Sequence, residues 1–198
     1  MNIGDLLGLD DGSELLGLAR QRWGKWTNEH PALNVVDAFD DVQSWLVGAD
    51  REAADTVLWS LAMLASPDGG DDVAAAGALA KCLLPGACAE AGRLSEMVAR
   101  GQVPRARATS GQINELVASQ LWIEVRTFAW RRLKKVAANI LVNTRIGVLR
   151  ELGDNTQMWR KDRVWANTVL LDDLATGGND AHTKAPVMDP AVISGTRP

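Results

Sequence analysis

The stretch that decides the fold is residues 109–128, TSGQINELVASQLWIEVRTF, in a chain of 198 residues. Its first four residues fit a capping box, in which the Thr109 hydroxyl and the Gln112 side chain each bind an otherwise unpaired backbone amide. Apolar side chains then recur at helical spacing along one face: Ile113, Leu116, Val117, Leu121, Val125 and Phe128. Residues 109–128 are therefore predicted to form an amphipathic helix.

The same helical spacing continues on the C-terminal side of this stretch. The helical spacing of the apolar residues is interrupted at 129–132. A second helix then follows as far as Gly153, which can end it as a left-handed cap. Residues 155–172 can add one short helix with Trp159 and Trp165. Residues 173–198 are rich in Gly, Pro, Asp and Thr without periodicity, so we expect a mobile tail there.

Helices are also predicted on the N-terminal side. Ser13 can cap the first one, and apolar residues at helical spacing predict two more over 34–47 and 50–65. An Ala-rich helical stretch runs from Val73 to Gly101, and Pro85-Gly86 is expected to kink or break it. No stretch alternates apolar and polar residues as a strand does. The sequence predicts an all-α fold, an irregular bundle of about six to seven helices.

Charge divides the chain into unequal parts. Residues 1–99 hold 6 basic and 16 acidic residues, residues 100–163 hold 13 and 5, and the whole chain has a net charge of −4. We therefore predict an acidic helical part at 1–101, a basic helical part at 102–172 and the tail at 173–198. This asymmetry indicates either a basic part that faces nucleic acid or two parts that attract each other.

Catalytic and metal-binding motifs are absent from the sequence. It has no phosphate-binding loop, dinucleotide fingerprint, nucleophile elbow or zinc-protease motif. His30 and His182 stand alone, and Cys82 and Cys88 are expected to be buried apolar residues. The N-terminus lacks the basic region of a secretory signal. We expect a cytoplasmic protein that is not an enzyme, with no metal, cofactor or membrane contact.

The second helix of the basic part carries polar side chains on the face opposite its apolar residues. Lys135, Asn139 and Asn143 lie on this face, and Trp130, Arg131 and Arg132 precede it. Cationic and amide side chains along one helix face can bind phosphates and base edges, and an exposed indole can stack on an unpaired base. The alternative is a solvated helix face with Trp130 packed in the core.

Two segments of the basic part resemble region 2 of bacterial sigma factors. Residues 115–122, ELVASQLW, with 125–128, VRTF, resemble its first half, although Ala118-Ser119 stand where a Gln-Glu pair is usual. Residues 130–132, WRR, with 136–145, VAANILVNTR, resemble its second half, an aromatic followed by an "Ala-x-Asn-Leu-hydrophobic-x-x-x-Arg" helix. The stretch is also similar to sigma-like proteins of high-GC Gram-positive bacteria and their phages.

This resemblance implies two functional surfaces. The first would bind the RNA polymerase core through Glu115, Ser119, Gln120 and Trp122. The second would bind promoter DNA through Trp130, Arg131, Arg132, Lys135, Asn139 and Asn143. The alternative function is a non-enzymatic helical protein–protein interaction module of phage or plasmid type. Its basic half would bind an acidic protein surface or its own acidic half, and an oligomer is possible.

Overall fold

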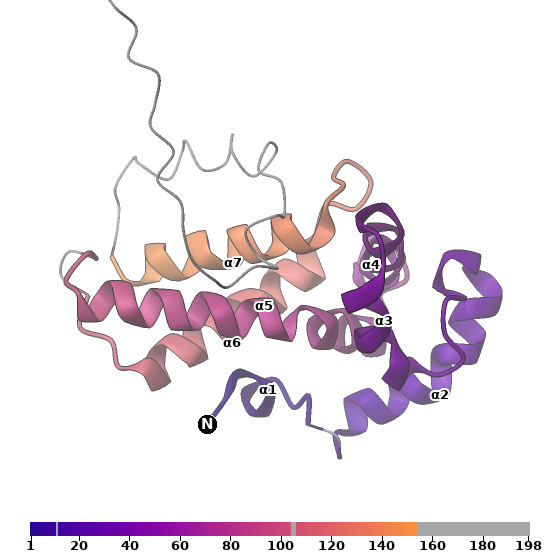
Figure 1. Ribbon diagram of the computed structural model, residues 1–198, viewed down its shortest axis with the longest axis horizontal. Coiled ribbons are helices and arrows are strands. Elements are labelled where there is room, and N and C mark those ends of the chain that lie inside the picture. Colours follow the sequence, from indigo (N-terminus) through magenta and orange to yellow (C-terminus); the bar gives the residue numbers. More distant parts are fainter. Residues whose placement is uncertain (11, 104–105, 154–198) are drawn as a thin grey trace, which may run out of the picture.

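The protein is all-α, as the sequence predicts, in a computed structural model that describes residues 1–10, 12–103 and 106–153 (Figure 1). These residues form seven α-helices and two 3-10 helices, and no strand. In chain order the elements are α1 (Ile3–Leu6), α2 (Glu14–Glu29), η1 (Pro31–Leu33), η2 (Phe39–Asp41), α3 (Val42–Gly48), α4 (Arg51–Ala65), α5 (Val73–Ala99), α6 (Ser110–Thr127) and α7 (Val136–Glu151). The predicted helix at 155–172 and the predicted tail lie outside the described residues.

The long helix α5 is the centre of the bundle, and α1, α2, α4, α6 and α7 all pack against it. Its first turns are built almost wholly of buried small residues, which let the neighbouring helices approach closely. A Cβ atom on Gly86 would lie 2.5 Å from a methyl group of Leu141, so the Leu141 side chain of α7 packs directly against this glycine of α5. Buried residues from Ile3 to Leu149 belong to one hydrophobic core, to which both the acidic and the basic part contribute.

By length and composition α5 could also cross a membrane, but 56% of its most apolar window is buried inside the bundle. Core helices of globular proteins commonly have this composition.

The sequence predicts that Pro85-Gly86 kinks or breaks this helix, and the break does not occur, because α5 runs through both residues. Pro85 faces solvent, whereas Leu83 and Ala87 on either side of it are buried in the core. A proline inside a helix removes one backbone hydrogen bond and costs about 3 kcal/mol. Burial of the residues on both sides of Pro85 offsets this cost and keeps the helix continuous.

The helix predicted over 34–47 is also wrong in its first half. Residues 34–38 form an irregular turn, and the helical part is η2 followed by the short α3. The carbonyl of Val36 accepts a hydrogen bond from the indole of Trp23 at 3.2 Å, and the Phe39 ring packs on the same indole at 5.8 Å between centroids. These tertiary contacts with α2 hold Val35 and Val36 partly buried without a helix.

The helix ends of the basic part are capped in two different ways. Thr109 and Gln112 form the predicted capping box at the start of α6, and Gly153, at φ +80°, follows the end of α7 as predicted. The start of α7 has no cap of its own, because Lys135 at the cap position is left-handed (φ +55°) and makes no side-chain cap hydrogen bond. The carboxylate of Asp55, on α4, takes that role by accepting hydrogen bonds from the amides of Lys135 at 2.9 Å and Val136 at 2.6 Å.

Candidate functional site

The turn between α6 and α7, residues 129–135, is called the basic corner below. It carries four cationic side chains within five positions, and all four are exposed: Arg131, Arg132, Lys134 and Lys135. The turn leaves α6 after Phe128, whose ring is buried, and enters α7 at the buried Val136. These two anchors and the Asp55 cap fix the backbone of the basic corner against α4.

The indole of Trp130 is neither fully exposed nor buried in the core. Its Nε1 donates a hydrogen bond to the Asp68 carboxylate at 2.9 Å, and its ring meets Trp59 of α4 edge-on, with centroids 5.5 Å apart. The Trp59 indole in turn donates to the Trp130 carbonyl at 2.8 Å. The guanidinium of Arg131 lies over the Trp130 ring at 4.2 Å. A base could stack on this face of the ring only after Arg131 had moved away.

Part of the basic charge is paired with the loop between α4 and α5, residues 66–72. Arg131 contacts the Asp68 carboxylate at 3.3 Å, and Arg126 pairs with Asp71 and donates to the Ala65 carbonyl at 2.6 Å. Asp68 also accepts a hydrogen bond from the Ser66 hydroxyl, which is the main reason that the pKa of this carboxyl lies below its ordinary value. The Trp130 indole and Arg131 lower that pKa further. The two parts of the chain therefore attract each other at this contact.

The two asparagines predicted to contact nucleic acid are less accessible than their spacing suggests. The Asn139 amide group donates hydrogen bonds to the carbonyls of Lys134 at 2.6 Å and Lys135 at 3.1 Å, so it stabilises the turn before α7. Asn143 is partly buried within α7. The cations of the basic corner are thus the more available of the predicted nucleic-acid-binding residues.

A pocket of about 350 Å³ opens beside the basic corner. Its lining combines three arginines with the loop after α4 and the end of α6: Ser66, Pro67, Asp68, Arg126, Thr127, Phe128, Ala129, Arg131 and Arg132. Of these arginines, Arg126 and Arg131 pair with Asp71 and Asp68. An anionic group could bind at the Arg132 side of this pocket by charge-assisted hydrogen bonds.

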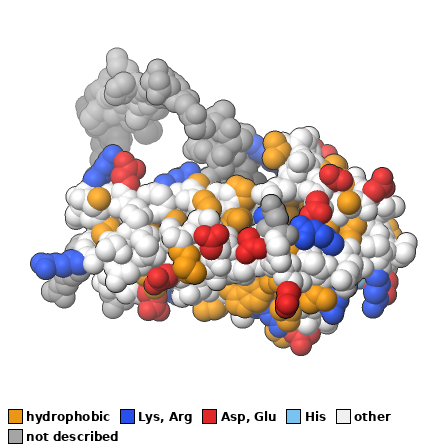
Figure 2. Space-filling model, turned by 90° about the horizontal axis from the view of Figure 1, so that it is seen from below, with side chains coloured by type: hydrophobic (Ala, Val, Ile, Leu, Met, Phe, Trp, Pro, Cys, Tyr) orange, Lys and Arg blue, Asp and Glu red, His pale blue; other side chains and the backbone are white. Residues whose placement is uncertain are grey.

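Three of the four predicted polymerase-binding residues share one surface. Glu115, Ser119 and Trp122 line a groove of about 620 Å³ between α6 and the N-terminal elements, called the α6 groove below. The other lining residues are mainly apolar: Leu6, Leu7, Leu15, Val73, Ala118 and Ile123. Val73 and Ile123 are 50% and 48% exposed, which is high for large aliphatic side chains. Figure 2 shows hydrophobic side chains gathered on the underside of the molecule, with acidic side chains beside them.

The fourth of these residues, Gln120, lies elsewhere. Its side chain covers Gly147 of α7, where a Cβ atom would be 2.3 Å from the Gln120 Oε1 atom. Gln120 therefore belongs to the packing between α6 and α7 and is separate from the groove.

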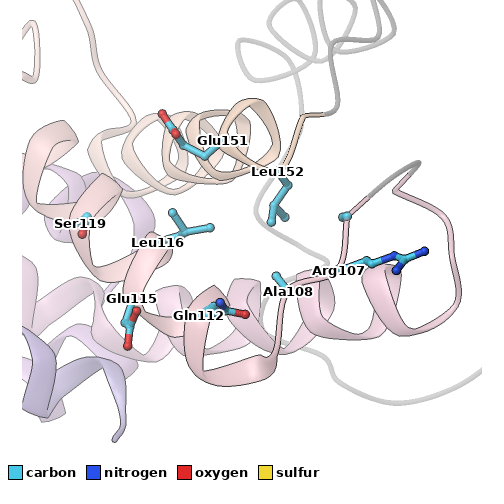
Figure 3. A pocket seen from close by; sticks show the side chains of 9 residues that line it. Arg107, Ala108, Gln112, Glu115, Leu116, Ser119, Glu151 and Leu152 are labelled. Carbon is cyan, nitrogen blue, oxygen red and sulfur yellow. The ribbon is translucent and has the colours of Figure 1, made fainter.

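A second pocket, of about 550 Å³, adjoins the α6 groove and shares Glu115 and Ser119 with it. Leu116 of α6 and Leu152 at the end of α7 lie on two sides of it, and Glu151 and Arg107 lie at its rim (Figure 3). Because the shared residues stand on α6, the pocket and the groove form one continuous surface along this helix. This surface begins where the described part of α7 ends.

Sequence reasoning missed the residues that hold the basic corner in place. Asp55, Trp59 and Asp68 come from the acidic part and contact the basic corner across more than 60 positions of sequence. The only signal that could have pointed to them was the attraction expected between the acidic and basic parts.

Cysteine and metal chemistry add little to this site. Cys88 is exposed, so the expectation that both cysteines are buried is wrong for it, whereas Cys82 is partly buried. The described residues contain no group of three or more His, Cys, Asp or Glu side chains placed to hold a metal ion.

No protein-family model, curated protein or solved structure matches the chain.

Proposed function

We propose that this chain is a sigma-factor-like transcription protein, not an enzyme, which binds nucleic-acid backbone through the basic corner and a protein partner through α6. The observation that supports it most is the exposure of Arg131, Arg132, Lys134 and Lys135 together on one short turn. Phosphate contacts supply most of the affinity of proteins for nucleic acids, and they need cations in this kind of cluster. The resemblance of residues 115–145 to sigma region 2 supports the same assignment.

The packing around Trp130 and Asn139 narrows this proposal. Since the Arg131 guanidinium covers the Trp130 ring and the Asn139 amide is bonded to the turn, the basic corner is suited to phosphates rather than to base edges. Any sequence-specific contact would then require these side chains to rearrange. We therefore propose binding that depends strongly on salt and weakly on DNA sequence.

The test uses the full chain with fluorescently labelled single-stranded and forked DNA, titrated at several salt concentrations. Arg132→Ala/Lys134→Ala should weaken binding about 10-fold or more at low salt and lower the salt slope by about 1.4, the value for two lost single-strand contacts. The control variant Lys25→Ala/Arg100→Ala removes two exposed cations elsewhere and should bind normally. Equal losses in both variants, or affinity that does not change with salt, would exclude the basic corner as the binding surface.

The polymerase contact is tested separately by pull-down with RNA polymerase core enzyme. The variant Glu115→Ala/Trp122→Ala changes two residues of the α6 groove and should lose binding, and Val47→Ala, at an exposed site on α3, should retain it. If the groove variant and the wild type are retained equally, the docking face is wrong.

The second candidate function is a helical protein–protein interaction module. The α6 groove supports it, because a largely apolar groove flanked by helices is a common site for a partner helix. The pairing of Arg126 and Arg131 with the acidic loop supports the version in which the basic half binds its own acidic half. A chain that binds neither DNA nor polymerase but retains a protein partner through α6 would favour this candidate.

A further inference from the structure

We infer that the α6 groove and the pocket beside it are the docking site of this chain's own segment 154–172. The two cavities share Glu115 and Ser119, so they form one surface that leads from the end of α7 to the apolar side chains beside α1. The segment follows directly after Gly153, at the near end of that surface. In this position the segment would cover most of the α6 face that we assign to a protein partner.

The composition of the segment fits an apolar surface. Residues 154–172 read DNTQMWRKDRVWANTVLLD and contain two of the eight tryptophans of the chain, together with Met158 and the run Val169-Leu170-Leu171. Segments that stay unpacked are poor in such residues, because large apolar side chains gain free energy by burial. Trp159 and Trp165 are thus the anchors that need a cavity, and the groove walls of Leu6, Leu7 and Ile123 offer one.

Charge also favours this occupant. Glu115 is the one charged residue among those that line the α6 groove, and Glu151 stands at the rim of the adjoining pocket. Between its two tryptophans the segment carries Arg160, Lys161 and Arg163 against one aspartate. The stretch between the two tryptophans therefore carries a net positive charge that complements Glu115 and Glu151.

The length of chain is sufficient. Along α6, Leu116 in the pocket and Ile123 in the groove are seven residues apart, which is about 10 Å at 1.5 Å per residue. The five residues between Gly153 and Trp159 cover about 17 Å when they are extended. Trp159 can therefore reach the middle of the surface. Trp165 can then reach its far end. The left-handed Gly153 (φ +80°) provides the change of chain direction after α7.

The experiment is methyl NMR on the full chain labelled at isoleucine δ1, which gives six signals because the chain has six isoleucines. Ile123 lies in the groove, and the fully buried Ile140 is the internal reference. Trp159→Ala/Trp165→Ala should shift the Ile123 signal and leave Ile140 unchanged, because only Ile123 would lose the ring current of a neighbouring indole. The control Met188→Ala/Val192→Ala, later in the chain, should move neither.

The outcomes are decisive in both directions. A shift of Ile123 alone that does not depend on protein concentration supports docking within one molecule. A shift that grows with concentration means that the segment binds a second copy, and an unchanged Ile123 signal means that it does not bind the groove; either result overturns the inference. Neither DNA nor polymerase enters this experiment, so it can fail while the proposed function stands.

A crosslinking experiment checks the same contact without changing the segment. A photoreactive benzoyl-phenylalanine at position 123, which is exposed, should form an intramolecular crosslink to residues 158–171, identified by mass spectrometry. The same group at position 47, an 87% exposed site on α3, should not. Crosslinks from position 123 only to other molecules, or to no part of 154–172, would contradict the assignment.

Discussion

The substitution Asp55→Ala tests how the basic corner is held. The Asp55 carboxylate accepts the amides of Lys135 and Val136, at 2.9 and 2.6 Å, from a position 80 residues earlier in the chain, and it replaces the missing cap of α7. Removing a helix cap costs about 1 kcal/mol and up to about 2. A carboxylate at a helix N-terminus adds about 0.3–1 kcal/mol through the helix dipole. Since both amides lose their partner together, we expect a loss of about 2 kcal/mol.

Urea denaturation, followed by circular dichroism, measures this loss, and a thermal scan should show a decrease in Tm of about 4–8 °C for a protein of this size. Asp37→Ala is the matched control, because Asp37 is exposed and its removal changes the net charge equally. It should stay within about 0.5 kcal/mol of the wild type. If the two variants are equally stable, the hydrogen bonds of Asp55 do not cap α7, and other contacts hold the basic corner in place.

Three further predictions concern other parts of the molecule. Pro85→Ala should stabilise the protein by about 1–3 kcal/mol in urea denaturation, because it restores a backbone hydrogen bond on the solvent face of α5; a less stable variant would refute this. The exposed Cys88 should react with a thiol reagent in the native protein faster than Cys82, which is partly buried and whose pKa burial raises to about 12; two equally fast thiols would be the contrary result. Asp68→Asn should be less stable than the wild type at neutral pH, and the difference should shrink below about pH 4. A carboxylate whose pKa is lowered on folding contributes stability above its ordinary pKa of 3.8, and this contribution is lost on acidification. A difference that is the same at pH 7 and pH 3 would mean that the charge of Asp68 is not involved.

The elements that the sequence predicts correctly are those with local signals. The capping box of Thr109 and Gln112 and the apolar stripe of residues 50–65 depend on neighbours within a few positions, and both helices are present. The errors arise where tertiary contacts outweigh such signals. The Val36 carbonyl accepts a hydrogen bond from the Trp23 indole, and Val36 is not helical. Pro85 lies inside α5 because the residues on both sides of it are buried.

The same distinction applies to the candidate site. The family resemblance implies one surface for Glu115, Ser119, Gln120 and Trp122. The structure brings three of them together in one groove, but Gln120 covers Gly147 of another helix. The resemblance also cannot show which cations are already paired. The guanidinium groups of Arg131 and Arg126 pair with Asp68 and Asp71, and these aspartates come from a part of the chain whose position depends on the complete fold.

The capping of α7 by Asp55, a residue of α4, also has a consequence for the order of folding. Helix α6 carries its own capping box, so its first turn can form early from local interactions alone. The first turn of α7 needs Asp55, and closing a loop of 80 residues is entropically costly until α4 and α5 have packed. We therefore expect the basic corner to be among the last features to form and the first to open in hydrogen exchange. A chain whose acidic part is unfolded would then present its cations only as a loose segment, so the acidic part determines when the positively charged turn has a defined shape.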